Sequence, residues 1–360
     1  MKNILCIGKY SGIIGGIERY IQKSAEILRR NGFAVHYLYT ENGGRDQENF
    51  AGAFDSIQKF TPENPRLKDA DMVVIHNIIA VEALQFMPAD KTFFFAHDHN
   101  IYCQRHHYYM PVGRINCHRR HSKFICKLCS LCRNEPPPLE EYRKFPALVL
   151  SDFMADNLRK NGFEKVFKLP AFIRTSEKER SFMPDGILRI LFLGQLIRGK
   201  GADLMLKTLA RVDIPFECTI AGDGKDRELL EQMTEKLDLQ DKVHFKGFVS
   251  EPETLWDECD LFFFPIRWQE PFGLVGLEAM AHGVPVMAFD LGGVREYLSC
   301  ECGALIPEKD IRSAAKQLKY FSSHPEVLEQ LGKNGLLRAR EDFSEARFVE
   351  HFKNLKEISK

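Results

Sequence analysis

The sequence has neither a long apolar run nor a net charge. Its 360 residues carry 50 Lys and Arg against 50 Asp and Glu, and nowhere do about 18 apolar residues follow one another, the length that a membrane-spanning helix needs. A balanced charge argues against a protein coated for bulk nucleic-acid binding, which is usually strongly basic. At roughly 150 residues a domain, the length predicts two domains, each with its own core.

A secretory leader is also missing from the first residues. The opening Met1-Lys2-Asn3 leads directly into an apolar run that is too short for a signal-peptide core and has no small-residue cleavage site after it. We therefore expect a cytoplasmic chain, at most peripheral at the inner face of a membrane. Its ten cysteines are then expected to be free or metal-bound rather than joined in disulfides.

Acidic residues are absent from one long window, between Asp98 and Glu135. Because of this window, residues 1–175 carry 25 Lys and Arg against 18 Asp and Glu, a net charge of +7, and the remainder carries a net of −7. The window also contains five of the ten cysteines. Its cations and cysteines are Arg105, Arg114, Arg119, Arg120, Lys123, Lys127, Arg133, Cys103, Cys117, Cys126, Cys129 and Cys132.

Short apolar runs alternate with helix-period segments along the whole chain. Continuous apolarity indicates strands that are buried on both faces, as in parallel sheets covered by helices. The predicted strands lie at 4–8, 35–39, 72–76, 92–96, 147–150, 166–169, 187–193, 216–221, 243–245, 261–265 and 284–288.

The polar stretch 175–186 interrupts this alternation, and the scheme then restarts. We predict an α/β protein of two Rossmann-like, doubly wound domains, over 1–175 with an insertion at about 99–134, and over 176–343. A final helix over 344–360 is expected to pack back towards the N-terminal domain. Ligands of such sheets lie outside the carboxyl ends of the strands, so two such domains are expected to face each other across a cleft.

The densest chemical signal lies between residues 263 and 286. Pro271 near the first turn predicts a helix that starts there, and Gly283-Val284-Pro285 predicts its end. The free N–H groups around Gly273 suit a phosphate. Glu270 and Glu278, eight residues apart, are suited to accept hydrogen bonds from hydroxyl groups of a ligand. Equally, Glu270 is explained as a partner of the helix dipole and Glu278 as a glutamate on the helix surface.

This segment resembles the E-x7-E region of the GT4-type retaining glycosyltransferases of GT-B fold. Six further motifs resemble that family in the same order: Gly15-Gly16-Ile17-Glu18, His97-Asp98, Ser151, Gly194 through Lys200-Gly201, Ala221-Gly222-Asp223-Gly224 and Phe245-Lys246-Gly247-Phe248. Later segments Gly283-Val284-Pro285-Val286 and Gly292-Gly293 agree as well. Together the matches span nearly the whole chain.

The resemblance implies a role for each matching residue. Glu270 would contact hydroxyls of the donor sugar, Glu278 those of the ribose, and Lys200 the diphosphate. His97 would lie beside the transferred sugar, so the implied catalytic residues are His97, Glu270 and Lys200. The implied donor-binding set is Gly15, Gly16, Gln195, Arg198, Lys200, Gly247, Phe248, Glu270, Phe272, Gly273, Leu274, Val275 and Glu278.

One residue departs from the family pattern. Members usually have Arg directly after the glycine that matches Gly194, whereas this chain has Gln195. Arg198 stands three residues later in the same loop and is expected to replace the missing charge, because a diphosphate leaving group needs neutralisation.

The implied reaction moves a sugar from a nucleotide-diphosphate donor to a saccharide or lipid-linked saccharide in cell-surface polysaccharide or glycolipid assembly, with retention of configuration. No Asp-x-Asp motif is present, and no cofactor is expected for catalysis. An epimerase or a phosphorylase on the same fold is the alternative, and a nonenzymatic binding protein is disfavoured by the motif residues. A nicotinamide enzyme is disfavoured because Gly12-Ile13-Ile14-Gly15-Gly16 is not G-x-G-x-x-G.

The cysteine-rich window leaves two interpretations open. Cys103, Cys117, Cys129 and Cys132 are predicted ligands of a structural zinc, with Cys126 and nearby histidines as substitutes. Reduced cysteines that pack a loop explain the same residues. The cations around them favour an anionic membrane surface or a pyrophosphate-linked acceptor, and nucleic acid is not an expected partner.

Overall fold

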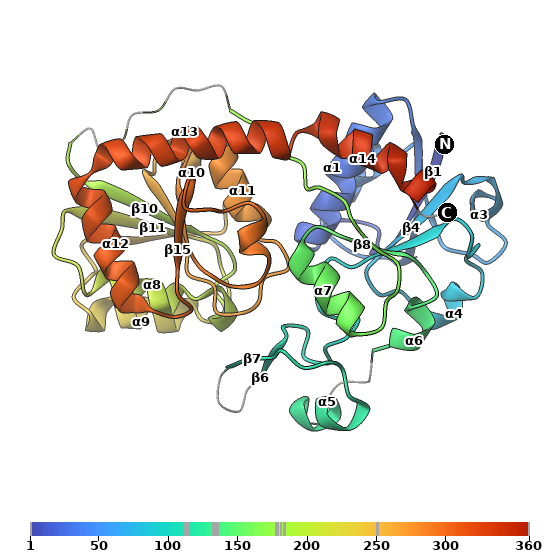
Figure 1. The fold of residues 1–360 in the computed structure, drawn as a ribbon, viewed down its shortest axis with the longest axis horizontal. Helices are drawn as coiled ribbons and strands as arrows, with labels where there is room; N and C mark the ends of the chain where they lie inside the picture. Colours follow the sequence, from blue (N-terminus) through green and yellow to red (C-terminus); the bar gives the residue numbers. More distant parts are fainter. Residues whose placement is uncertain are drawn as a thin grey trace. The chain divides into compact units, whose positions relative to one another are not determined.

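The alternating apolar runs form two parallel sheets in the computed structural model of the protein (Figure 1). The structure describes residues 2–110, 115–131, 137–176, 180, 182, 185–249 and 252–358. The chain divides into two units: unit 1 holds residues 1–170 and 345–360, and unit 2 holds residues 171–344. The sequence placed these boundaries after residues 175 and 343.

Unit 1 is built on a seven-stranded sheet. The central strands are buried on both faces; Ile4, Leu5 and Ile7 of β1 have no exposed surface at all. Every neighbouring pair of strands is parallel. In sheet order the strands are β3 (Ser56–Lys59), β2 (Ala34–Glu41), β1 (Asn3–Tyr10), β4 (Met72–His76), β5 (Thr92–Phe95), β8 (Ala147–Val149) and β9 (Val166–Lys168).

The longest helix between these strands, α1, follows the glycine loop after β1 and buries one apolar side against the sheet. The backbone N–H of Gly15 donates to Oε2 of Glu18 at 2.9 Å, so a carboxylate stands at the positive end of this helix. The helices between the strands are α1 (Gly16–Arg30), α2 (Gln47–Gly52), α3 (Arg66–Asp69), α4 (Val81–Leu84), α6 (Leu139–Tyr142) and α7 (Asp152–Lys160).

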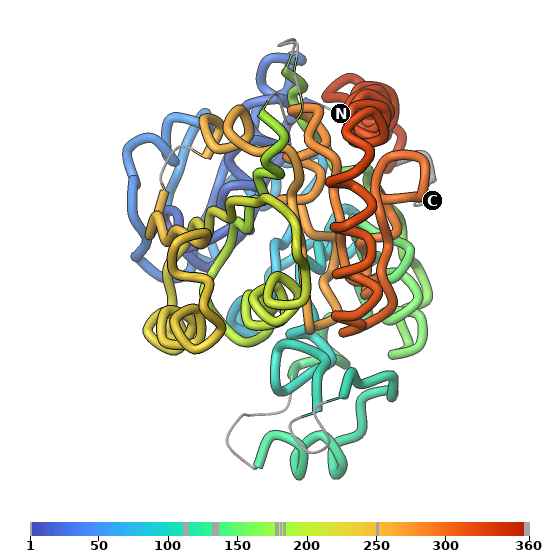
Figure 2. The backbone as a smooth tube through the Cα atoms, turned by 90° about the vertical axis from the view of Figure 1, so that its left-hand side faces the viewer, coloured from blue at the N-terminus to red at the C-terminus, as the bar shows by residue number. Residues whose placement is uncertain are grey.

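The insertion between β5 and β8 contains little regular structure. Before α6, its described residues hold a two-stranded antiparallel ladder, β6 (Tyr109–Met110) with β7 (Ile115–Asn116), and the helix α5 (Lys123–Cys129). Figures 1 and 2 both draw these elements, in teal, below the rest of unit 1.

The C-terminal helix α14 (Glu345–Ile358) packs on unit 1. The ring of Phe352 meets the ring of Phe33 edge to face at 6.1 Å. At the start of the helix, Arg30 forms an ion pair with Glu345 at 3.0 Å.

Unit 2 is built on a six-stranded parallel sheet in the order β12 (Val243–Gly247), β11 (Phe216–Ala221), β10 (Leu188–Leu193), β13 (Leu261–Phe264), β14 (Val286–Phe289) and β15 (Gly303–Ile306). Its helices are the 3-10 turns η1 (Arg198–Lys200) and η2 (Gly292–Glu296) and the α-helices α8 (Ala202–Leu209), α9 (Arg227–Lys236), α10 (Glu253–Asp257), α11 (Leu274–Ala281), α12 (Ile311–Ser323) and α13 (Pro325–Asp342).

Both sheets reverse their strand order at an inner pair, β1 with β4 in unit 1 and β10 with β13 in unit 2. Such a switch point leaves a crevice at the carboxyl ends of the two strands, where doubly wound sheets bind their ligands. The predicted motif that starts at Gly194 and the loop that leads to Glu270 follow the two switch strands of unit 2.

Two edge strands were not predicted from the sequence. β3 has half-buried and exposed residues rather than a buried run, and β15 begins with glycine. An edge strand has a partner on one side alone, so it needs less apolar surface than the central strands that set the predicted pattern. Within the described residues, no helix is long and apolar enough to cross a membrane.

Candidate active site

The switch point of unit 2 brings together two loops, 194–201 after β10 and 265–273 after β13. Backbone hydrogen bonds tie them to each other: the N–H of Arg267 donates to the carbonyl of Gly199 at 2.8 Å. The guanidinium of Arg267 also donates to both carboxylate oxygens of Asp203, each at 2.6 Å. The two loops therefore form one fixed support.

Glycine is required where these loops touch. Gly201 has a φ of +78°, and a Cβ added there would lie 1.8 Å from the carbonyl oxygen of Pro265. A Cβ on Gly199 would lie 2.0 Å from the ring of Trp268. A side chain at either position would push the loops apart because of this contact, and at Gly201 the left-handed backbone disfavours one as well.

Lys200 and Glu270 meet on this support. The ammonium Nζ of Lys200 donates to Oε2 of Glu270 at 2.9 Å, and both side chains are half-buried. The ammonium also lies 5.9 Å from the ring centre of Phe264. These are the two predicted catalytic residues of unit 2, and the fold places them side by side although 70 residues separate them.

Helix α11 begins at Leu274, four residues after Glu270. Gly273, with a φ of +88°, is its first flanking residue, and the helix runs for eight residues from Leu274. The first amides of a helix have no partner inside it and carry a partial positive charge. Leu274 and Val275, predicted to hold a phosphate, stand at this end and are half-buried.

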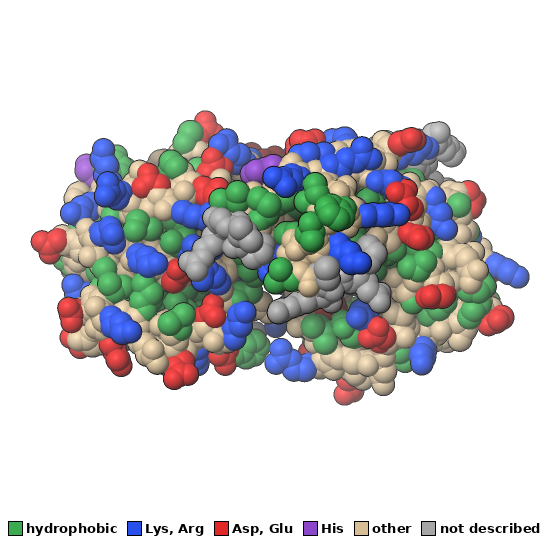
Figure 3. All heavy atoms as spheres, turned by 90° about the horizontal axis from the view of Figure 1, so that it is seen from below, with side chains coloured by type: hydrophobic (Ala, Val, Ile, Leu, Met, Phe, Trp, Pro, Cys, Tyr) green, Lys and Arg blue, Asp and Glu red, His purple; other side chains and the backbone are tan. Residues whose placement is uncertain are grey.

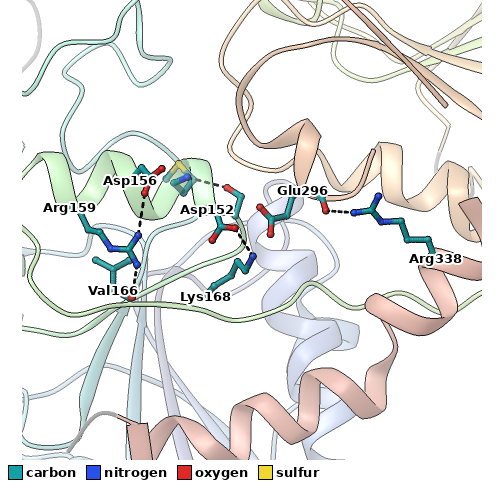
Figure 4. Close-up of polar contacts among 9 residues, drawn as sticks. Asp152, Asp156, Arg159, Val166, Lys168, Glu296 and Arg338 are labelled. Atoms are coloured by element: carbon teal, nitrogen blue, oxygen red, sulfur yellow. Dashed lines mark hydrogen bonds and ion pairs between the residues drawn. The ribbon is translucent and has the colours of Figure 1, made fainter. Parts of the chain in front are cut away.

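The backbone of Glu270 rests on the glycine pair of η2. The N–H of Gly293 donates to the carbonyl of Glu270 at 2.7 Å, and a Cβ on Gly292 would lie 2.2 Å from that same oxygen. The far end of η2 is held in turn, because Nη2 of Arg338 donates to the carbonyl of Glu296 at 3.1 Å (Figure 4). This packing explains why the Gly-Gly motif accompanies Glu270.

Sequence reasoning missed Tyr297, which packs beneath the start of α11. Its side chain is fully buried, and its hydroxyl would lie 2.1 Å from a Cβ added to Gly276 and 3.2 Å from one added to Gly273. Burial, and after it the nearby charge of Glu270, holds the pKa of this phenol well above its usual range. A glycine inside the predicted helix, at 276, was the signal that a large neighbour needed room.

The other predicted donor residues of unit 2 lie on the same support or at neighbouring strand ends. Phe272 is buried with its ring 5.3 Å from that of Tyr297, and Glu278 is half-buried on α11. Gly247 ends β12, and Phe248 after it is 59% exposed.

Gln195 and Arg198, both exposed, lie in the loop after β10. The carbonyl of Arg198 accepts from Nε of Arg267 at 3.2 Å. This bond fixes the backbone of Arg198, while its guanidinium lies at the surface. The expected replacement of the missing arginine therefore stays a prediction.

In unit 1, the predicted glycines open the first helix after β1. A Cβ added to Gly15 or to Gly16 would meet no described atom within 4 Å, and Gly15 has an extended backbone that any residue can adopt. Neither packing nor backbone strain therefore accounts for these two glycines. Free space at a helix start is compatible with close approach of a ligand.

His97 follows β5 and forms a pair with His76 at the end of β4. Nδ1 of His76 lies 2.9 Å from Nε2 of His97, within hydrogen-bond distance, and the ring of His97 stacks on Phe95 at 4.2 Å. Burial lowers the pKa of His76 to about 3. Burial, and then the neighbouring His76, holds the pKa of His97 well below its usual value. Both imidazoles are therefore neutral at pH 7.

The neighbourhood of this pair is ordered by short polar contacts. The carboxylate of Asp98 accepts from the side-chain amides of Asn77 at 3.1 Å and of Asn100 at 2.9 Å. Ser151, the predicted small residue, caps α7 by accepting from the N–H of Met154 at 3.2 Å. Figure 4 shows the first residue of α7, Asp152, in an ion pair with Lys168 at 2.8 Å.

Four cysteines of the insertion line one cavity of about 40 Å³: Cys103, Cys117, Cys126 and Cys129. Burial raises the pKa of the Cys103 thiol, and the N–H groups of Arg105 and Tyr108 that donate to it oppose that shift. Among the residues that the structure describes, no three His, Cys, Asp or Glu side chains are arranged to hold a metal. Cys132, the fourth predicted ligand, lies outside those residues, and the zinc site stays a prediction.

A larger cavity of about 280 Å³ lies elsewhere in unit 2. It is lined by charged and polar residues from the amino-terminal halves of β10 and β11 and from the end of α10, among them Arg189, Glu217 and Glu258. None of the predicted donor residues lines it. Lys246, which directly precedes the predicted Gly247, also lines it, so the cavity extends to the carboxyl end of β12.

The comparisons with known proteins follow the same division of the chain. Residues 173–338 match the family described as Glycosyl transferases group 1. An uncharacterized glycosyltransferase of Haemophilus influenzae is 29% identical over 171 residues, which cover 46% of this chain and 48% of that protein. The lipopolysaccharide core biosynthesis mannosyltransferase LpsB of Rhizobium meliloti is 29% identical over 195 residues, 50% of this chain and 55% of LpsB. The chain thus spans about half the length of these curated relatives.

Solved structures match nearly the whole chain. The crystal structure of Anabaena Alr3699/HepE in complex with UDP is similar over 98% of this chain and 99% of that one, with a TM-score of 0.74 and 17% identity. At this identity the likeness concerns the fold, and it confirms the predicted α/β fold of GT-B type with two Rossmann-like domains.

Proposed function

We propose that this chain, whose residues 173–338 match the Glycosyl transferases group 1 family, transfers a sugar from a nucleotide-diphosphate donor to a saccharide or lipid-linked saccharide, with retention of configuration. The observation that carries the proposal is the contact of Lys200 with Glu270 at the start of α11. A cation, a carboxylate and free helix amides at one switch point are the groups that a sugar diphosphate needs.

In the proposed donor site, a cation and helix amides bind the diphosphate, and carboxylates bind the hydroxyls of the sugar and the ribose. Lys200 and the amides of Leu274 and Val275 hold the diphosphate, because the helix start and the ammonium both favour negative charge. Glu270 accepts hydrogen bonds from sugar hydroxyls, and Glu278 accepts them from the ribose. The base is assigned to the end of β12, at Gly247 and Phe248, where the side chain of Phe248 is exposed.

Two similarities support this donor class. The HepE structure, similar in fold to this chain, contains UDP. LpsB, similar to about half of this chain, is a mannosyltransferase of lipopolysaccharide core biosynthesis. We propose the same broad setting here, the assembly of a cell-surface polysaccharide or glycolipid.

The proposed transfer proceeds on one face of the sugar. The bond between the anomeric carbon and the diphosphate oxygen breaks, and its electron pair goes to that oxygen. The acceptor hydroxyl then forms the new bond to the anomeric carbon, and its proton passes to the departing phosphate oxygen. Lys200 and the helix amides stabilise the charge that develops on the leaving group.

His97 and the glycines at 15 and 16 are assigned to the same donor. The low pKa of His97 keeps its ring neutral, so it is suited to donate or accept a hydrogen bond and not to repel a developing positive charge on the sugar. The absence of any packing role for Gly15 and Gly16 supports their assignment to the phosphate.

The proposal is tested with a panel of nucleotide sugars. We expect one donor to raise the melting temperature of the protein, and product analysis by NMR to show the anomeric configuration of that donor retained in the product. Glu270→Gln should abolish most turnover, while Glu258→Gln, which breaks the exposed pair of Glu258 with Lys246 in the same unit, should not. An inverted product, or a reaction that needs no acceptor, would rule the proposal out.

A further inference from the structure

The insertion between β5 and β8 exposes apolar side chains in a group. Of the twelve large hydrophobic residues that are exposed in the described part of the chain, five lie between residues 115 and 131: Ile115, Phe124, Ile125, Leu128 and Leu131. Single exposed apolar residues are normal on a protein surface, but a group of them marks an interaction site.

Helix α5 is the centre of this group. None of its seven residues is buried. Phe124 and Leu128, four residues apart and so on the same side of the helix, are 74% and 56% exposed. Ile115 of the ladder is 51% exposed. In the described part of the chain these apolar side chains stay exposed, so they are open to a partner.

Cations accompany these apolar side chains. Lys123 and Lys127 are also four residues apart on α5, next to Phe124 and Leu128, and both are exposed. Arg119 precedes the helix and is exposed as well. The sequence contains no acidic residue between Asp98 and Glu135. Seen from below in Figure 3, hydrophobic side chains gather beside Lys and Arg side chains on this face.

We propose that Ile115, Arg119, Lys123, Phe124, Lys127 and Leu128 form a docking surface for an anionic lipid bilayer. A short helix with an apolar stripe and a basic stripe is typical of helices that lie in the membrane interface. The lysines contact lipid phosphates, while the apolar side chains enter the region between headgroups and acyl chains. The phosphates of nucleic acid would satisfy the cations but would leave the apolar side chains in water.

This inference goes beyond the proposed reaction, because binding to a bilayer requires neither donor nor acceptor. The full chain is mixed with vesicles of phosphatidylcholine alone and with vesicles that contain about 30% phosphatidylglycerol, and co-sedimentation is measured at low and moderate salt. We expect binding to the anionic vesicles, weakened by salt, and much weaker binding to the neutral ones.

Two double variants separate the charge from the apolar contribution. Lys123→Glu with Lys127→Glu should weaken binding to anionic vesicles by about tenfold or more, since each cation near such a surface contributes measurably. Phe124→Ser with Leu128→Ser should weaken it by about tenfold. Matched controls in unit 2 are Lys316→Glu with Lys319→Glu, and Leu229→Ser with Leu337→Ser, all at exposed positions.

The controls also keep the test independent of folding and of the reaction. Each variant should melt like the unchanged protein and should keep its stabilisation by the nucleotide sugar, because none of the four changed residues of α5 belongs to the donor site. The proposal is overturned by equal binding to both kinds of vesicle, by no binding to either, or by loss of RNA binding alone in the lysine variant.

Discussion

The switch-point loops of unit 2 and the insertion of unit 1 differ in how their residues are held. Loops 194–201 and 265–273 are fixed by backbone hydrogen bonds and by glycines that leave no room for a side chain. The insertion contains a ladder of two residues a strand and a helix that buries nothing. A donor site needs charges held in place before the ligand arrives, whereas a bilayer accepts a surface without a unique geometry.

The largest expected effect comes from disrupting the contact between the two loops of unit 2. Gly201→Ala places a methyl group 1.8 Å from the carbonyl of Pro265 in a left-handed backbone, and should lower the stability of unit 2 by about 2–5 kcal/mol. Gly52→Ala at the end of α2, where a Cβ meets nothing within 4 Å, is the control and should be close to neutral. Equal urea midpoints for the two variants would show that the loops accommodate the added methyl group with little loss of stability.

The next largest effect is expected when a positive charge is removed from the loops of the candidate donor site. Lys200→Met should lower kcat/KM for the donor by about 10²–10³-fold, because one preorganised cation at the leaving group is lost. Arg198→Ala should lower turnover by less, and should change kcat more than donor affinity if the exposed arginine reaches the diphosphate. A kinetic assay in which Arg198→Ala matches the unchanged protein would remove Arg198 from the donor site.

The pH dependence of the unfolding free energy tests whether His76 in unit 1 is buried in its neutral form. The pKa of His76 is lowered to about 3, so the unfolded chain, with a pKa of about 6.5, binds a proton that the folded chain does not. Unfolding free energy should then fall by roughly 1.4 kcal/mol per pH unit for this group as the pH drops below about 6.5 towards 3.

The variant His76→Phe keeps the stacked ring and removes this titration, so its stability should fall less steeply with acid than that of the unchanged protein. His351→Gln, at an exposed position on α14, is the control. Parallel stability curves for the unchanged protein and His76→Phe would contradict a buried neutral His76.

The smallest expected effect lies in the insertion itself. Zinc held by Cys103, Cys117, Cys129 and Cys132 should appear as one ion per chain, and a chelator should raise hydrogen exchange in residues 115–131 without moving the melting of unit 2. Cys126→Ser alone should retain the metal. Substoichiometric zinc together with unchanged hydrogen exchange of residues 115–131 in chelator would leave the cysteines as reduced packing residues.

The sequence predicted the central strands and the E-x7-E segment because each lies in one continuous stretch of chain. Continuous apolar runs marked the buried strands, and Glu270 with its helix start lies within a few residues of Pro271 and Gly273. Edge strand β3 lacks that pattern, since its residues are half-buried or exposed, whereas β15 is a short apolar run that begins with glycine.

Contacts between distant residues could not be predicted in the same way. The pair of Lys200 with Glu270 depends on two loops that meet at a switch point, and the place of Tyr297 depends on Gly276 in another element. A sequence pattern shows that glycine is needed but does not show which side chain fills the space. The exposure of α5 was equally hidden, because the same alternation of Phe, Ile and Leu also describes a buried helix.

The return of α14 to unit 1 has a consequence for recombination between relatives. Residues 171–344 are an insertion within unit 1 in chain order, so a single crossover cannot exchange one unit for that of another protein. A chimera joined once, after residue 170, would pair Phe33 and Arg30 with a foreign C-terminal helix. Exchange of unit 2 that keeps α14 on its own unit therefore needs two junctions, at 170/171 and at 344/345.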